Sequence, residues 1–211
     1  PEGVALSFNG KPFENLSTFF HVGYFILDEV AASKDPHLFG SQLGGEISLT
    51  DNVSLGGRGT FYAIRSINTN LLNRLAQEGN LTTGGLGGFE GDDNKVHIGE
   101  LSTYIKWNAI KDWPILLHGT YARNFEAEGL DLAKNGADTG DEGDAFGIGL
   151  EFGDKKKWAR FGLAYWEMEA NSLPSQFMIE RALFDGRTNG EGFVFYGSKT
   201  IVDNTDLNLI L

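Results

Sequence analysis

Residues 144–168 decide the fold and read DAFGIGLEFGDKKKWARFGLAYWEM. Large apolar residues alternate with small or polar ones on both sides of a turn at 153–157. The apolar set comprises Phe146, Ile148, Leu150, Phe152, Ala159, Phe161, Leu163 and Tyr165. The opposite set comprises Gly147, Gly149, Glu151, Arg160, Gly162, Ala164 and Trp166. Because successive side chains of a strand point to opposite faces, the stretch predicts a β-hairpin with one apolar face.

The composition of the other face suggests where the apolar face points. A soluble sandwich buries its apolar face, whereas glycine with Arg160 and Glu151 suits the wall of a water-filled lumen. Apolar side chains outside and polar ones inside are typical of an antiparallel transmembrane β-barrel. The alternative is a soluble lipocalin-like barrel or sandwich that binds a small ligand. That protein would carry Arg58 and Lys106 outside and Leu163 within.

Composition is compatible with one β-barrel domain over residues 1–211. The chain has 29 glycines and 12% aromatic residues, which suits many strands and turns. Its net charge of −12 argues against a nucleic-acid partner. It has no cysteine and no apolar run of about 20 residues, the length that a membrane helix needs.

Similar alternation recurs along the rest of the chain, so about ten strands are predicted. Besides the hairpin they cover 4–8, 16–27, 38–50, 53–65, 95–108, 113–125, 193–202 and 205–211, and the facing of 16–27 is ambiguous. Asn9-Gly10 predicts a turn over 9–12. Short turns at 51–52, 111–112, 153–157 and 203–204 alternate with long connections at 66–94, 126–143 and 169–192. Outer-membrane barrels show this alternation.

Two further features sit in these connections. Trp107, Trp113 and Trp158 all lie beside short turns, as expected for half of an aromatic girdle at a membrane boundary. Segments 70–79 and 172–186 of the long connections have helical signatures. They would either narrow a pore by folding inward or remain exposed.

Four blocks carry a family resemblance: HVGYFILD at 21–28, LFGSQLGGE at 38–46, DGRTNGEGFVFY at 185–196 and DNTDLN at 203–208. With them the chain resembles the porin family of Gram-negative outer-membrane β-barrel proteins. The resemblance implies passive diffusion of small hydrophilic solutes and ions through a barrel in the outer membrane. Lipid and lipopolysaccharide would surround it, and a homo-oligomer is an open alternative. The family usually has more strands and a terminal aromatic residue, whereas this chain stops at Leu211, so a piece of a larger barrel is also open.

The inward faces supply the candidate pore-lining residues, which are Glu46, Arg58, Glu100, Lys106, His118, Glu151 and Arg160. In a pore such side chains select solutes by charge. The alternative is a paired network that stiffens the wall, with Glu46 bound to Arg58 and Glu151 to Arg160 across tight turns. No catalytic set, metal motif or cofactor motif is recognisable, so no enzyme is expected. An outer-membrane barrel enzyme would need a convergent Ser/His/acid set.

Overall fold

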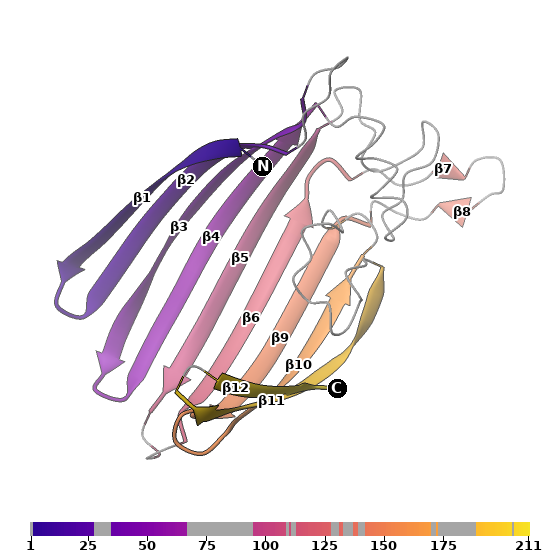
Figure 1. Cartoon of the computed structure of the whole chain (residues 1–211). Coiled ribbons are helices and arrows are strands. Elements are labelled where there is room, and N and C mark those ends of the chain that lie inside the picture. The colour runs from indigo at the N-terminus through magenta and orange to yellow at the C-terminus, as the bar shows by residue number, and fades with distance from the viewer. Residues whose placement is uncertain are drawn as a thin grey trace.

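The computed structural model describes residues 2–27, 35–66, 95–108, 110, 113–127, 131–132, 137–138, 142–169, 172, 189–203 and 205–211. They form one antiparallel sheet of ten strands in chain order, drawn in Figure 1. The strands are β1 (Glu2–Phe13), β2 (Leu16–Ile26), β3 (His37–Thr50), β4 (Val53–Arg65), β5 (Val96–Trp107), β6 (Ile115–Asn124), β9 (Asp144–Gly153), β10 (Arg160–Met168), β11 (Gly190–Val202) and β12 (Thr205–Ile210). The all-β, ten-stranded prediction is confirmed.

The sheet is not closed into a barrel in this structure. Its terminal strands β1 and β12 each pair with a single neighbour, β2 and β11 respectively. Figure 1 shows the strands as a curved sheet with β11 and β12 crossing in front of its lower end. A separate two-stranded ribbon, β7 (Asp131–Leu132) with β8 (Ala137–Asp138), lies within the predicted connection 126–143 and was not expected from the sequence.

The predicted turn over 9–12 is wrong. Asn9 and Gly10 lie inside β1, where they pair with Phe19 and Thr18 of β2, and the chain turns between Phe13 and Leu16 instead. Pairing along a long partner strand outweighs the local turn preference of Asn-Gly. The register shifts between Gly10 and Phe13. That shift accommodates the proline at position 12, which cannot donate a ladder hydrogen bond and is tolerated in an edge strand.

The short turns have local hydrogen bonds that explain their positions. At the β3–β4 turn, Thr50 Oγ1 accepts from the backbone N–H groups of Asn52 and Val53 at 3.3 and 3.1 Å. At the β9–β10 turn, Asp154 Oδ1 accepts from the Lys156 N–H at 2.9 Å. Gly153 begins this turn with a φ of +94°, which an L side chain rarely adopts.

A small apolar core lies at the end of the sheet that adjoins the long connections. It is formed by Ile64, Val96, Ile98, Ala122, Ala145 and Met168, with Tyr62 and Trp166 packed against it. These residues project from the same face as the predicted pore-lining residues, so that face is polar only over its middle and its short-turn end. The sequence analysis missed this apolar patch.

The helical signatures cannot be compared with the structure. Segment 70–79 lies outside the described residues, and only Ser172 of segment 172–186 is described. Across the described part of the chain, no helix is long and apolar enough to cross a membrane.

Candidate functional site

One row of large apolar side chains runs across the whole sheet, with one residue from each strand or from its end. Backbone register places its members side by side as Phe13, Leu16, Ile47, Leu55, Ile105, Leu117, Leu150, Leu163, Phe195 and Leu211. We call this set the leucine row. Leu117, Leu150 and Leu163 in its middle are 43%, 48% and 50% exposed. The face that carries it, termed the apolar face, is therefore uncovered in the described structure.

The apolar band around the leucine row crosses the strands obliquely. Tyrosines aside, the first charged side chain or histidine beyond the row stands ten residues away in β4, eight in β5, six in β6 and β9, and four in β10. These residues are Arg65, His97, Arg123, Asp144 and Glu167. The boundary thus shifts by six residues over four strand spacings. At about 3.4 Å per residue and about 4.8 Å per strand, it crosses the sheet at about 45°.

Aromatic rings mark the short-turn end of this band. The rings of Trp113 and Trp158 have centroids 5.1 Å apart, and each also contacts a phenylalanine of the β9–β10 hairpin. Trp107 and Trp158 are exposed. The predicted grouping is confirmed for Trp113 and Trp158, and Trp107 ends β5 on the same face.

Tyrosines and ion pairs mark the opposite end. The Tyr121 hydroxyl donates to Asp144 Oδ1 at 2.7 Å, and Arg123 Nη1 lies 3.0 Å from Asp144 Oδ2. On the neighbouring hairpin, the Tyr165 hydroxyl donates to Glu191 Oε2 at 2.7 Å. The apolar band is therefore bounded on both sides by amphipathic or charged groups.

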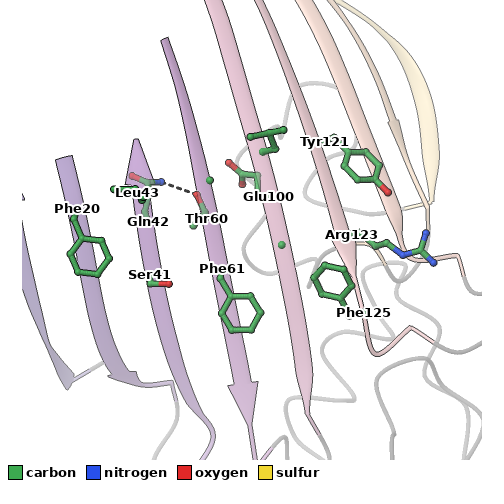
Figure 2. A pocket seen from close by; sticks show the side chains of 13 residues that line it. Phe20, Ser41, Gln42, Leu43, Thr60, Phe61, Glu100, Tyr121, Arg123 and Phe125 are labelled. Atoms are coloured by element: carbon green, nitrogen blue, oxygen red, sulfur yellow. Dashed lines mark hydrogen bonds between the residues drawn. The ribbon is translucent and has the colours of Figure 1, made fainter. Parts of the chain in front are cut away.

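Glycines open a depression within the band, shown in Figure 2. It has a volume of about 410 Å³ around Gly59 and Gly99, and it is lined by the rings of Phe20 in β2, Phe61 in β4, Tyr121 in β6 and Phe125 just beyond β6. A Cβ added at Gly59 would meet no heavy atom within 4 Å, so this part of the apolar face is open. The dashed bond in Figure 2 joins Gln42 Nε2 to Thr60 Oγ1 at 3.0 Å.

The backbone register places all seven predicted pore-lining residues on the opposite face, termed the polar face. They are Glu46 in β3, Arg58 in β4, Glu100 and Lys106 in β5, His118 in β6, Glu151 in β9 and Arg160 in β10. Lys106 stands near the short-turn end and is exposed. Four of the seven form two ion pairs, Arg58 with Glu100 and Arg160 with Glu151. Glu46 is bonded to Tyr104, and His118 Nε2 has no hydrogen-bond partner among the described residues.

The first of these pairs contains Glu100, whose side chain is only 18% exposed. Arg58 Nη2 lies 3.5 Å from Glu100 Oε1, and the Ser102 hydroxyl donates to the same oxygen at 3.0 Å. Ser102 and Thr120 share a further hydrogen bond of 3.0 Å. The predicted Glu46–Arg58 pair is wrong, since Arg58 binds Glu100 and Glu46 accepts from the Tyr104 hydroxyl. Arg58 is two residues out of register with each carboxylate, since Glu46 stands opposite Gly56 and Glu100 opposite Thr60.

The second pair contains Glu151, whose side chain is 17% exposed. Arg160 Nη1 lies 3.5 Å from Glu151 Oε2, which confirms the predicted cross-strand pair. The Tyr196 hydroxyl donates to Glu151 Oε1 at 2.5 Å, and His118 Nε2 stands 4.0 Å from that oxygen, beyond hydrogen-bond range. One carboxylate therefore links strands β9, β10 and β11.

Rings on the polar face cover glycines of the neighbouring strand. An added Cβ at each glycine would overlap the ring of its cross-strand partner, in the pairs Gly44–Phe19, Gly56–Tyr104, Gly149–His118, Gly147–Trp166 and Gly162–Tyr196. Such aromatic cover of strand glycines is known from sheets in general. In this sheet the cover keeps bulky rings close to the polar face, so they do not project into the space in front of that face.

Sequence reasoning missed the tyrosines and phenylalanine of these pairs as site residues. Tyr104, Tyr196 and Phe19 bind carboxylates or line the polar face, yet only the charged side chains attracted notice. No local signal reveals these three pairs, because the strands of each pair are joined by one of the longer connections, which hide the register from the sequence. Phe19 also resolves the ambiguous facing of β2, since its partner Gly44 belongs to the polar face.

The described residues contain no group of three or more His, Asp or Glu side chains arranged to hold a metal ion. No protein-family model matches the chain, and no curated protein matches it either. The resemblance of the sequence to porins therefore stays a prediction.

Proposed function

We propose that this chain forms the wall of an outer-membrane porin of a Gram-negative bacterium. The apolar face would contact lipid and lipopolysaccharide, and the polar face would line a water-filled pore for small hydrophilic solutes and ions. The observation that carries the proposal is the exposed apolar band, whose boundary toward the long connections crosses strands β4 to β10 at about 45° to the strand-perpendicular rows. Strands of transmembrane barrels tilt by about 35–45°. A band that follows a flat membrane must cross tilted strands obliquely.

The alternative, a soluble β-domain with a ligand inside, fits the side chains less well. Its apolar residues should pack together, yet Phe146, Ile148 and Leu163 are 43%, 45% and 50% exposed. Exposed apolar surface on this scale marks a contact with lipid or another protein.

Closure of the barrel is part of the proposal. The alternation continues to both edge strands, with Leu6 and Phe8 on the apolar face of β1 and Leu207 and Leu209 on that of β12. Because an even number of strands separates the edges, β1 and β12 run antiparallel and have compatible directions for pairing. Further strands or a second copy of the chain would close the sheet equally well.

The experiment that tests the proposal is a planar lipid bilayer recording. The purified protein should insert from detergent and give stepwise ion currents. Protein that stays monodisperse without detergent and never conducts would contradict the porin and favour the soluble domain.

Ion selectivity should be weak, because the wall is nearly balanced in charge. The predicted pore-lining residues on the polar face include three acidic and three basic ones, namely Glu46, Glu100 and Glu151, and Arg58, Lys106 and Arg160. The net charge of −12 resides largely in the long connections, where salt screens it beyond about 8 Å. We expect a slight cation preference in reversal potentials that fades as salt is raised.

The same recordings on Glu151→Gln should shift the preference toward anions, since Arg160 loses its counter-charge. Glu142→Gln, which changes a carboxylate outside the strands, is the matched control and should have a smaller effect at high salt. A strong cation preference that persists near molar salt would contradict the balanced wall.

Topology supplies a further prediction. The short turns should lie on one side of the membrane and the long connections on the other, as the length alternation indicates. The chain has no cysteine, so single cysteines can be introduced without background. Lys156→Cys in the β9–β10 turn and Asn189→Cys, just before β11, should react with a membrane-impermeant maleimide from opposite sides. Labelling of both from outside intact cells would overturn the assignment.

A further inference from the structure

Part of the polar face is hollowed into a groove. It has a volume of about 490 Å³ and spans β2 to β6. Its lining includes Ser17, Phe19, Glu46, Arg58, Tyr104 and Thr120. This volume falls in the range of about 300–1,000 Å³ that small-molecule sites occupy.

Two aromatic rings form the apolar part of this groove. Phe19 lies over Gly44 and stacks on His21, with ring centroids 4.9 Å apart and planes inclined by 25°. Tyr104 lies over Gly56, and its hydroxyl donates to Glu46. One face of the Phe19 ring is stacked on His21, which leaves its opposite face for the groove. Such a face carries partial negative charge and attracts the slightly positive C–H groups of a ligand.

Polar groups surround these rings and offer both donors and acceptors. Ser17, Ser102 and Thr120 supply hydroxyl oxygens that can accept. Their protons are used by the Glu46 carbonyl, Glu100 and Ser102 respectively. Glu46 supplies carboxylate oxygens. Arg58 is 51% exposed on its side chain and touches Glu100 through one amino nitrogen, Nη2. A guanidinium has five N–H donors in a planar fork, so this cation can also serve a ligand's oxygens.

Charge favours a neutral occupant. The groove is lined by one carboxylate, Glu46, and one guanidinium, Arg58, and each already has a partner, the Tyr104 hydroxyl and Glu100 respectively. An ion would gain little from these partnered groups, whereas a ligand rich in hydroxyls satisfies both groups with hydrogen bonds. Alternating C–H faces and hydroxyl edges are the chemistry of sugars and polyols.

We propose that this groove is a binding subsite for a neutral sugar or polyol, formed by Phe19 and Tyr104 as stacking surfaces and by Glu46 and Arg58 as hydrogen-bonding partners. The role of this site rests on the proposed porin function. In a pore, the site would slow and select the passing solute. Its existence as a binding site does not require conduction.

The test is a titration of the detergent-solubilised full chain with maltotriose, followed by saturation-transfer NMR on the sugar C–H protons. We expect saturable binding, and Phe19→Leu should weaken it by about tenfold, the equivalent of about 1.4 kcal/mol of stacking. Phe20→Leu is the matched control, because it makes the same change at the next residue on the apolar face. It should leave the dissociation constant unchanged.

Other outcomes separate this site from the porin proposal. Binding without bilayer currents would support the site and contradict the pore. Currents with no saturable sugar binding would contradict the site alone. Equal effects of Phe19→Leu and Phe20→Leu, or binding of L-serine in preference to maltotriose, would overturn the assignment to a neutral polyhydroxylated ligand.

Discussion

Leu117→Arg should destabilise the protein folded in a lipid bilayer by about 2–4 kcal/mol. This is the cost of arginine at the lipid-facing midplane of a barrel. Leu117 lies in the leucine row between Ile105 and Leu150. It also stands midway between Trp113 and Tyr121, the aromatic residues that bound the band along this strand. Urea titrations of protein reconstituted in lipid vesicles measure the change.

Leu116→Arg is the control for that experiment, since it makes the same change one residue earlier. Leu116 points to the polar face between Lys106 and Glu151, where arginine can reach water and a carboxylate. Its effect should stay within about 1 kcal/mol. Equal costs at the two positions would mean that the two faces share one environment, contrary to the proposed wall.

Gly56→Val should narrow the pore and destabilise the wall together. A side chain at position 56 overlaps the ring of Tyr104, which must swing away from the wall and give up its hydrogen bond to Glu46. Overpacking of this kind costs about 1–3 kcal/mol. Single-channel conductance should fall because the displaced ring enters the lumen, and both quantities are measurable on the same reconstituted sample.

Gly59→Val is its control on the same strand. Position 59 belongs to the apolar face, and an added Cβ there meets no heavy atom within 4 Å. Conductance should match that of the unmodified chain. Gly149 would be an unsuitable control for any facing experiment, because the ring of His118 lies over it. If Gly56→Val conducts like Gly59→Val, the rings do not border the conducting path.

The strands could be predicted from the sequence because alternation is a local signal. Each of Phe146, Ile148 and Leu150 reveals its face through its immediate neighbours. The turns between paired strands are equally local, apart from Asn9-Gly10. That dipeptide favours a turn by itself, but pairing with β2 keeps it extended.

The partners of the charged residues could be predicted only in part. Glu151 and Arg160 flank one tight turn at similar distances along the chain, so their cross-strand proximity could be predicted. Arg58 had two candidate carboxylates, one on each neighbouring strand. Its choice of Glu100 depends on the β4–β5 register, and the long connection 66–94 hides that register from the sequence.

The measurement that tests the central claim most directly compares Leu116→Cys with Leu117→Cys. The two residues are identical and adjacent, and the structure places them on opposite faces. Each cysteine carries an environment-sensitive fluorophore in proteoliposomes, and quenchers are added either in the lipid or in the water. We expect lipid-resident quencher to act on position 117 and aqueous iodide on position 116. Equal quenching at both positions, or the reverse order, would contradict an apolar face turned to lipid.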